Sequence, residues 1–291
     1  MTKLSPENGF AIIDKEPGWT SHDVVARARK ILDTRKIGHS GTLDPPASGI
    51  LILGIGKATR LLRFITDLQK EYVATMVLGS ETDTLDAAGE ITETTKHLPS
   101  LSQLQESAST YVGNIQQIPP MVSAIKIKGK RLYQLAREGK EIHRDPRNVT
   151  IHHIEICQSS ESNVYQIKVS CGSGTYIRSL VSDIAKKSGS LAHVGTLRRT
   201  AIGSFDESFA NPIDGVQVIS MSEGLRDYDK ISVSADVGER IKVGSVMEKE
   251  KLGIHSGRGP WPVINANDEL LAVYENYNHG TVKPAGVISQ D

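Results

Sequence analysis

The chain of 291 residues is poor in the groups that define several protein classes. It has only two cysteines, Cys157 and Cys171; they could pair, but in an unsecreted chain we expect reduced thiols. No run of about 18 apolar residues occurs, so no transmembrane helix is expected. The N-terminal segment lacks the apolar stretch of a secretory signal. No Cys/His cluster has zinc-site spacing. These absences predict a cytoplasmic protein without a metal.

The chain also lacks net charge, with 34 Lys and Arg against 34 Asp and Glu, which argues against a generally adhesive basic protein. The distribution is uneven. Residues 1–70 and 121–150 carry an excess of positive charge, whereas residues 71–120 and 211–291 carry an excess of negative charge. The two positive blocks would form one phosphate-facing surface if the fold brings them together. They could equally be separate solvated faces, and charge alone does not decide between these.

Strand and helix patterns alternate along the chain without a strict βαβ repeat, which favours an α+β fold. Helices are expected at 22–32 (capped by Ser21), 57–68, 101–112, 131–138 and from about residue 177. Strands are expected at 9–14, 50–55, 71–78, 149–157, 164–171, 261–264 and 270–274, with an extended stretch at 116–130. Beyond about residue 210 the chain becomes acidic and predicts a small β-rich module.

A phosphate-binding loop is the main rival interpretation of the N-terminal third. Gly54-Ile-Gly56-Lys57-Ala-Thr59 follows a strand and opens a helix. A P-loop requires a glycine where Leu51 stands and a hydroxyl residue where Ala58 stands, and the dinucleotide fingerprint requires a glycine at Thr59. Both signatures fail, so nucleotide hydrolysis and NAD chemistry are not expected.

Asp44 is the first candidate for chemistry. It lies between a glycine-rich approach and Pro45-Pro46, directly before an apolar strand. Glycines allow close backbone approach and prolines restrict the loop, so a carboxylate held there suits a nucleophile or a general base. The competing interpretation is that Asp-Pro simply forms a turn.

Arg178 and Tyr72 are the next candidates. Arg178 falls in the first turn of a helix, where a cation opposes the helix dipole unless it pairs with a carboxylate or a phosphate. A solvated surface arginine explains the position equally well. Tyr72 shares a strand face with Ala74 and Met76, and an aromatic ring there packs in a core more often than it binds a ligand.

Six ordered blocks over about 200 residues resemble the TruB family of tRNA pseudouridine-55 synthases. They are GFAIIDKEPGWTSHDVV (9–25), GHSGTLDPPASGILILGIGKATR (38–60), KEYVATMVLGSETDTLDAAGE (70–90), IPPMVSAIKIKGKRLYQLAREG (118–139), GTYIRSLVSDIA (174–185) and HVGTLRRTAIGSF (193–205). The resemblance implies a pseudouridine synthase fold, α+β with a mixed, mainly antiparallel sheet, over residues 1–228. A small β-rich PUA-like RNA-binding domain is expected at 229–291, where the resemblance is weaker.

The resemblance also implies roles for individual residues. Asp44 matches the catalytic aspartate, Tyr72 the tyrosine that stacks on the target base and assists proton removal from C5, and Arg178 the arginine that pairs with the carboxylate. Residues expected to contact the RNA are Lys15, His39, Tyr176, Leu197, Lys126, Lys130 and Arg131. The basic stretch 126–147 is expected to hold the T-arm backbone, with salt-dependent affinity.

The implied reaction isomerises uridine 55 in the T-loop of tRNA after the base is flipped out. Atoms and oxidation state balance, so no cofactor is expected. Asp44 could attack C1′, attack C6, or remove the 2′-proton to give a glycal. The expected partner is the tRNA T-arm, without guide RNA, bound by a monomer. Three alternatives are a tRNA-folding chaperone, a guide-RNA-dependent synthase and an RNA-binding scaffold.

Overall fold

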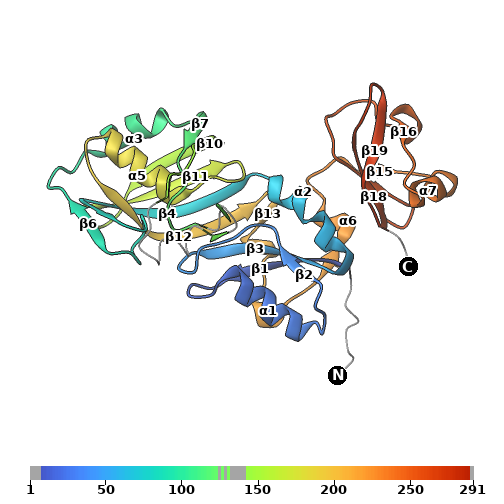
Figure 1. Cartoon of the computed structure of the whole chain (residues 1–291), viewed down its shortest axis with the longest axis horizontal. Coiled ribbons are helices and arrows are strands. Elements are labelled where there is room, and N and C mark those ends of the chain that lie inside the picture. Colours follow the sequence, from blue (N-terminus) through green and yellow to red (C-terminus); the bar gives the residue numbers. More distant parts are fainter. Residues whose placement is uncertain (1–7, 124–125, 128–129, 132–141, 289–291) are drawn as a thin grey trace.

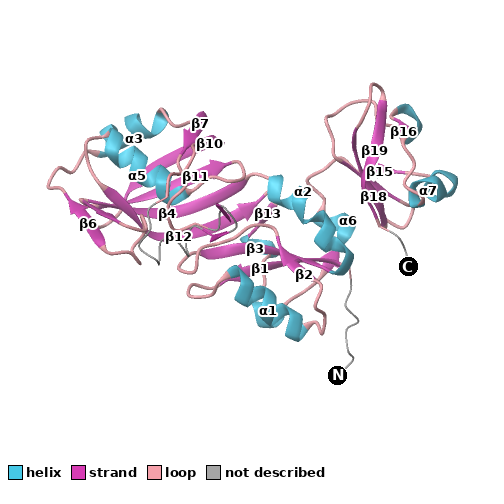
Figure 2. Cartoon of the chain, viewed as in Figure 1, coloured by secondary structure: helices cyan, strands magenta, loops and turns pink. Residues whose placement is uncertain are grey.

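The computed structural model describes residues 8–123, 126–127, 130–131 and 142–288, which form an elongated molecule of two parts (Figure 1). The larger part is built on a ten-stranded sheet and the smaller on a separate five-stranded sheet. Figure 2 shows that strands dominate both parts and that helices lie against their faces. This is the expected α+β fold with a mixed, mainly antiparallel sheet and a small β-rich C-terminal module.

The elements of the larger part occur in one continuous series along the chain. They are β1 Gly9–Lys15, α1 Ser21–Ile31, β2 Ile37–His39, β3 Ser48–Ile55, the 3₁₀ helix η1 Gly56–Leu61, α2 Leu62–Asp67, β4 Lys70–Leu78, β5 Ser80–Thr82, β6 Ile91–Thr94, α3 Leu101–Ser109, β7 Gly113–Gln117, β8 Lys126–Ile127, β9 Lys130–Arg131, β10 Arg147–Gln158, β11 Val164–Cys171, α5 Ile177–Lys187, β12 Ala192–Ile202, β13 Phe205–Asp206, η2 Glu207–Phe209, η3 Ile213–Gly215, β14 Ile219–Ser220 and α6 Met221–Gly224.

The main path of the large sheet runs β14-β1-β3-β12-β4-β11-β10-β7, with β2 beside β3 and β13 beside β12. All of its pairings are antiparallel except β3 with β12, which extends over only two residue pairs, Arg198 with Ser48 and Arg199 with Gly49. Gly49 has φ +101°, and a Cβ there would lie 2.2 Å from the carbonyl oxygen of Arg199. The sheet therefore consists of two halves joined at one short parallel junction, where only glycine allows the strands to approach so closely.

Strands β1 and β3 are apolar on both faces, as continuous runs such as Ile50–Ile55 predict for doubly covered strands. One face, with Ile13 and Leu53, packs against α1. The opposite face, with Phe10 and Ile52, packs against η1 and α2. In the other half, α3 and α5 cover β4, β10, β11 and β12. Helices on these faces exclude water from the sheet and so make the junction a rigid base for a site.

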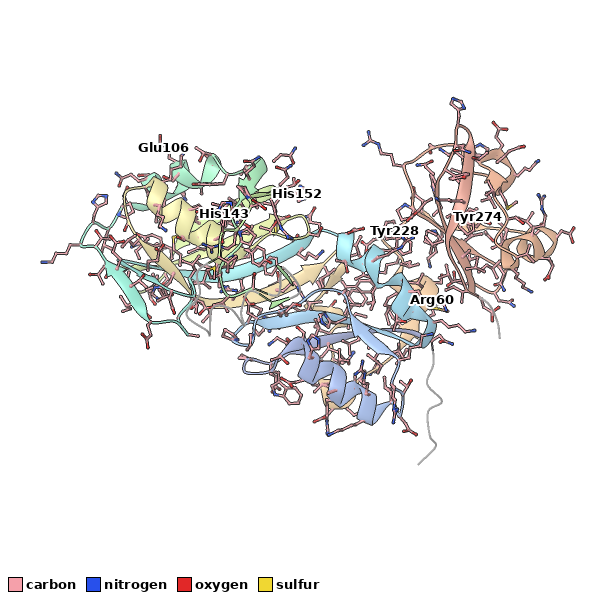
Figure 3. The ribbon with its side chains drawn as sticks, viewed as in Figure 1. Arg60, Glu106, His143, His152, Tyr228 and Tyr274 are labelled. Atoms are coloured by element: carbon pink, nitrogen blue, oxygen red, sulfur yellow. The ribbon has the colours of Figure 1, made fainter. Side chains whose placement is uncertain are left out.

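The C-terminal module has its own sheet and core. Its elements are β15 Ile231–Ser232, α7 Ala235–Lys242, β16 Met247–Glu248, η4 Glu250–Leu252, β17 Trp261–Ile264, β18 Leu270–Asn276 and β19 Thr281–Val287. Trp261 and Tyr274 are buried in this core. Leu270 and Val273 instead join the core cluster of α2 and β1, and Tyr228, labelled in Figure 3, donates a hydrogen bond to the Phe64 carbonyl at 2.7 Å. The module is therefore docked through apolar contacts.

Several expected boundaries need correction. The cap of α1 is Thr20, which forms a capping box with Asp23, and Ser21 instead bonds the Leu43 backbone at the base of the next loop. The helix expected at 57–68 begins as the 3₁₀ helix η1, and the one expected at 101–112 ends at Ser109. The helix expected at 131–138 falls almost wholly outside the described residues.

Candidate active site

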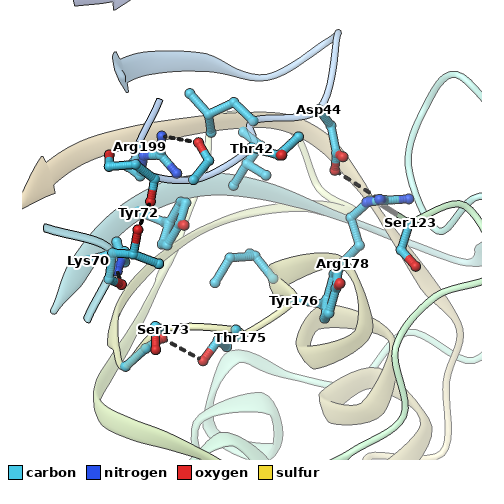
Figure 4. A pocket seen from close by; sticks show the side chains of 18 residues that line it. Thr42, Asp44, Lys70, Tyr72, Ser123, Ser173, Thr175, Tyr176, Arg178 and Arg199 are labelled. Atoms are coloured by element: carbon cyan, nitrogen blue, oxygen red, sulfur yellow. Dashed lines mark hydrogen bonds and ion pairs between the residues drawn. The ribbon is translucent and has the colours of Figure 1, made fainter. Parts of the chain in front are cut away.

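A pocket opens at the junction between the two halves of the large sheet (Figure 4). Its volume is about 260 Å³, near the lower end of the roughly 300–1,000 Å³ typical of small-molecule pockets. Its walls come from the β2–β3 loop, β4, the β11–α5 turn and β12, and they include Asp44, Lys70, Tyr72, Tyr176, Arg178, Leu197 and Arg199. Five of these seven were singled out from the sequence.

Asp44 sits at the tip of the β2–β3 loop with its side chain 34% exposed. The loop is held against α1, because Leu43 is buried and its N–H donates to Ser21 Oγ at 2.9 Å. The Pro45 carbonyl accepts from the Gly18 N–H at 2.8 Å and from Lys15 Nζ at 3.3 Å. Asp44 is therefore an accessible carboxylate on a rigid loop, as the glycine and proline pattern predicts.

Arg178 is the buried partner of Asp44. Its Nη2 lies 2.8 Å from Asp44 Oδ2, although only 4% of the Arg178 side chain is exposed. The guanidinium also donates to the carbonyls of Thr84 at 2.6 Å and Val122 at 2.9 Å. A guanidinium group that donates to several acceptors at once has little freedom to move. The predicted pairing of Arg178 with a carboxylate is present, and the surface-arginine interpretation is wrong.

Asp86 is a site residue that the sequence reasoning missed. Its Oδ2 lies 3.4 Å from Arg178 Nη1, and its side chain is 13% exposed. Its Oδ1 accepts hydrogen bonds from Thr84 Oγ1 at 2.7 Å and from the Ala88 N–H at 3.0 Å. The block TDTLDAAG contained the signal, because an Asp followed by small residues forms such a turn.

Tyr72 lies half-buried in the pocket wall on β4, directly opposite Arg199 of β12 in the strand register. It packs against the apolar core and also lines the pocket, so the core-packing interpretation is confirmed and stacking on a base stays a prediction. Burial raises the pKa of the Tyr72 phenol, and the neighbouring Arg199 guanidinium partly offsets that effect. Leu197, from a bulged part of β12, adds an apolar surface to the pocket.

Arg199 and Lys70 are two buried cations in the pocket wall that sequence analysis did not identify. Arg199 is 2% exposed and donates through Nε to the Ile50 carbonyl at 2.7 Å and through Nη2 to the Gly41 carbonyl at 3.3 Å. Lys70 is 6% exposed, and its Nζ donates to the carbonyls of Thr66 and Leu68. Desolvation, reinforced by the charge of Arg199, lowers the pKa of Lys70 to about 8.

Tyr176 precedes α5 and lines the pocket, and its contact with RNA stays a prediction. Its N–H donates to Gln117 Oε1 at 2.8 Å, and Gln117 Nε2 donates back to its carbonyl at 3.0 Å. This reciprocal pair fixes the start of α5 and with it the direction of Arg178. Residues 172–175 form part of the same wall.

Two of the remaining expected RNA contacts, Lys15 and His39, lie outside the pocket wall. Lys15 is 1% exposed, and its Nζ donates to the carbonyls of Glu16, Trp19 and Pro45. It therefore supports the Asp44 loop and does not line the site. His39 ends β2 and meets His22 edge to face at 5.4 Å; desolvation and His22 lower its pKa. Lys126, Lys130 and Arg131 belong to the β8–β9 hairpin, and their side chains fall outside the described part.

The geometry defines a carboxylate-based site in a pocket of about 260 Å³, on a fold with a small second module. A family model described as the N-terminal domain of TruB family pseudouridylate synthases matches residues 29–177. A protein named tRNA pseudouridine synthase B from Shouchella clausii is 35% identical, with 95% of this chain and 96% of the relative covered. One of the same name from Bacillus anthracis is 37% identical, with 96% and 97% covered.

Solved structures agree with these matches. A crystal structure of a Cbf5-Nop10-Gar1 complex has a chain with a TM-score of 0.73 and 26% identity, covering 97% of this chain and 84% of that one. An H/ACA RNP bound to a substrate RNA containing 2′-deoxyuridine gives a TM-score of 0.68 at 25% identity, with 92% and 77% covered. The chain belongs to the TruB family of pseudouridylate synthases and is an isomerase of that class.

Two further findings concern what the described residues contain. None of their helices combines the length and apolar character needed to cross a membrane. Within the same residues, no three His, Cys, Asp or Glu side chains converge as metal ligands would. The expectations about location and cofactors stay predictions.

Proposed function

We propose that this chain isomerises uridine 55 in the T-loop of tRNA to pseudouridine, with Asp44 as the catalytic carboxylate. The observation that supports this most directly is the pairing of accessible Asp44 with buried Arg178 at 2.8 Å in the wall of a pocket that suits one base. The relatives named tRNA pseudouridine synthase B, similar over nearly the whole chain, support tRNA as the substrate.

Entry of the target uridine requires that the base leave the T-loop stack and turn into the pocket. Unstacking costs a few kcal/mol, which contacts in the pocket and on the phosphates offset. Tyr72 and Leu197 offer the ring and the apolar surface on which a flipped base would pack. The β8–β9 hairpin, with Lys126, Lys130 and Arg131, is proposed to hold the T-arm backbone. His39, at the edge of the β2–β3 loop, is proposed to fill the space that the base leaves.

Asp44 is positioned to act on the nucleotide because Arg178 engages Oδ2 and the side chain remains partly exposed. Attack on C1′ would transfer the glycosidic electron pair to N1 of the uracil. Attack on C6 would place charge on the ring first, and removal of the 2′-proton would give a glycal. In each route the detached ring turns and C5 bonds to C1′. The bond from Asp44 to C1′ breaks as C5 attacks, the bond from Asp44 to C6 breaks when C5 loses its proton, and the glycal regains its 2′-proton from Asp44. The C5 proton is lost and N1 gains a proton. Substrate and product are isomers, so the balance needs no other reactant.

Tyr72 is proposed to assist the loss of the C5 proton. A phenol with a raised pKa is protonated at neutral pH and is a poor base by itself. The adjacent Arg199 guanidinium favours the phenolate form of Tyr72, so the cation would stabilise the negative charge on the phenol oxygen during proton transfer. The C-terminal module, proposed as the PUA-like domain from residue 229, would add RNA contacts. We propose a monomer that acts without guide RNA.

The test uses a bare T-arm stem-loop, the purified chain and mass-spectrometric mapping of pseudouridine. Wild-type protein should convert uridine 55 without any added RNA or protein. Asp44→Asn should abolish conversion while binding of the stem-loop persists. Asp83→Asn, a matched change at an exposed aspartate outside the pocket, should retain turnover. Near-wild-type conversion by Asp44→Asn would refute the assignment. Conversion only with a guide RNA would favour the guide-dependent alternative.

A further inference from the structure

Lys70 and Arg199 place two positive charges in the pocket wall without a carboxylate partner. Neither forms an ion pair within 4.0 Å among the described residues, and the acceptors that both cations bond are backbone carbonyls. Buried cations are costly unless an opposite charge compensates them. Asp44, the acidic side chain in the pocket lining, is already occupied by Arg178. The wall therefore keeps an uncompensated positive charge.

The two cations lie apart from the catalytic ion pair. Figure 4 shows Lys70, Tyr72 and Arg199 gathered at one end of the pocket, and Asp44 with Arg178 at the other. Lys70 and Tyr72 are two positions apart on β4 and so share a face of the strand. Arg199 is the register partner of Tyr72 on β12. A base whose sugar meets Asp44 would thus extend its ring toward the two cations.

Each cation has a structural role, but that role does not account for its charge. Lys70 bonds carbonyls at the end of α2, and Arg199 ties β12 to β3 and to the β2–β3 loop. A carbonyl dipole stabilises a cation without cancelling its net charge. A neutral donor would satisfy the same carbonyls at a lower desolvation cost. Two full charges here indicate a ligand that becomes negative.

The proposed reaction produces such a ligand. When the N1–C1′ bond breaks toward the ring, its electron pair delocalises from N1 onto O2 and O4. When a carboxylate adds to C6, the displaced pair moves onto O4. Every such route makes the pyrimidine ring more negative than in bound uridine, and fixed charges that meet developing charge favour the transition state.

We propose that Lys70 and Arg199 form an anion-stabilising wall that holds the uracil ring more tightly as negative charge builds up on it. This inference rests on the proposed function. It extends that function by assigning the stabilisation of negative charge on the uracil ring to two residues outside the Asp44–Arg178 pair. Tyr72, between them, contacts the same ring.

The test compares the affinity of two T-arm stem-loops, one with uridine and one with 6-hydroxyuridine at the target position. The second ring is a barbiturate, which has nearly the shape of uracil and is ionised at neutral pH. Wild-type protein should bind the anionic RNA about 10- to 100-fold more tightly than the uridine RNA. This preference is at the low end of the range for transition-state analogues, because 6-hydroxyuridine reproduces only the charge of the transition state. RNA recovered from the binding assay should elute as it did before the assay, which shows that the protein has not altered it.

Lys70→Met should reduce this preference to about threefold or less and slow single-turnover conversion of uridine about tenfold or more. Arg199→Lys should keep the preference, and Arg199→Gln should lose it. Lys30→Met, which removes an exposed cation on α1, should change both affinities alike. A purely structural role for Lys70 would lower both affinities together and leave their ratio unchanged.

The inference is overturned if wild-type protein shows no preference for the anionic RNA, or if Lys70→Met retains it. Should Arg199→Gln not fold, Lys70→Met decides. Failure of wild-type protein to convert uridine in the unmodified stem-loop would refute the proposed function instead. The two failures are therefore distinguishable.

Discussion

Asp44 and Asp86 share one guanidinium. Arg178 reaches Asp44 Oδ2 with Nη2 at 2.8 Å and Asp86 Oδ2 with Nη1 at 3.4 Å. Asp86 is the more buried of the two carboxylates, and it is also bonded within its own loop. Asp86 therefore helps to orient the guanidinium together with the carbonyls of Thr84 and Val122, while Asp44 keeps an exposed edge. The orientation of the Asp44 carboxylate depends on a loop far away in the sequence.

Replacing Asp86 by Asn should slow conversion without weakening RNA binding. The substitution keeps the size of the side chain but removes the charge that orients Arg178. Breaking a buried ion pair by removing one charge costs about 3–5 kcal/mol. Arg178 keeps its other acceptors, so we expect part of this cost in the reaction, as about a 10- to 100-fold lower single-turnover rate. Single-turnover kinetics on the T-arm stem-loop measure this, and filter binding measures affinity.

Asp83→Asn is the control for distortion of the same loop. Asp83 is exposed and accepts the Glu90 N–H at 2.9 Å without touching Arg178. Its rate should stay within about threefold of wild type, because surface changes rarely perturb a distant site. Equal losses in both variants would show that loop shape, and not the charge of Asp86, controls the rate.

Arg178→Lys should lower both activity and stability. An ammonium group cannot reproduce the fork that serves Asp44, Asp86 and two carbonyls at once. Acceptors left without a donor in a buried site cost about 1–3 kcal/mol each. We expect a rate at least about 100-fold lower and a lower midpoint of urea unfolding. A variant with wild-type stability and rate would contradict the assigned geometry.

Local patterns allowed many elements to be predicted before the structure. β1, β3 and α5 follow from apolar runs and from the 3.6-residue period, which depend on neighbours in the sequence. The pairing of Asp44 with Arg178 was expected from the family resemblance, supported by the unfavourable place of a cation at a helix start.

Lys70 and Arg199 were not predicted, because their surroundings arise only when the sheet closes. Arg199 is simply one of two adjacent basic residues until β12 is placed between β3 and β4. Lys15 has the pattern of a free cation until the Asp44 loop folds over it. Long-range strand pairing decides these environments, and a single sequence contains no local signal for it.

Activity should fall as the pH rises through about 8. The pKa of Lys70 is about 8, lowered mainly by desolvation and by Arg199, with Cys171 and Asp67 acting in the opposite direction. Above that pH the proposed anion-stabilising wall loses one charge. Lys70→Arg, which stays charged, should hold its rate up to about pH 9. Single-turnover rates from about pH 6.5 to 9 check this, and parallel profiles for both proteins would contradict it.

Folding stability should respond to pH in the opposite direction. Between about pH 8 and the ordinary lysine pKa of 10.5, the unfolded state binds the Lys70 proton and the folded state does not. The free energy of unfolding therefore rises with pH across this window. Lys15, whose pKa desolvation also lowers to about 8, adds to the effect. Urea unfolding should show a smaller rise in Lys70→Met than in wild type, and an equal rise would refute the assignment to Lys70.

Gly49→Ala should destabilise the protein strongly. A Cβ at this position would meet the Arg199 carbonyl oxygen at 2.2 Å, and φ is +101°. We expect a loss of more than about 2 kcal/mol in the free energy of unfolding. Gly280→Ala is the matched control, because Gly280 has φ +73° with no neighbour within 4 Å. Its cost should be about 1 kcal/mol. Similar losses of unfolding free energy in both variants would mean that strands β3 and β12 can move apart at their junction with little cost.

The contact between the two modules should depend on apolar packing more than on its ion pair. Arg63 Nη2 lies 3.0 Å from Glu275 Oε1, but both side chains are substantially exposed. Exposed pairs contribute about 0.2–1 kcal/mol. Leu270 is 4% exposed and packs in the core cluster shared with α2 and β1. Removing a buried leucine side chain costs about 2–5 kcal/mol. Leu270→Ala should therefore increase hydrogen exchange in both β18 and α2, whereas Arg63→Ala should leave exchange nearly unchanged. If Arg63→Ala were the more disruptive variant, electrostatic docking of the C-terminal module would have to replace the apolar explanation.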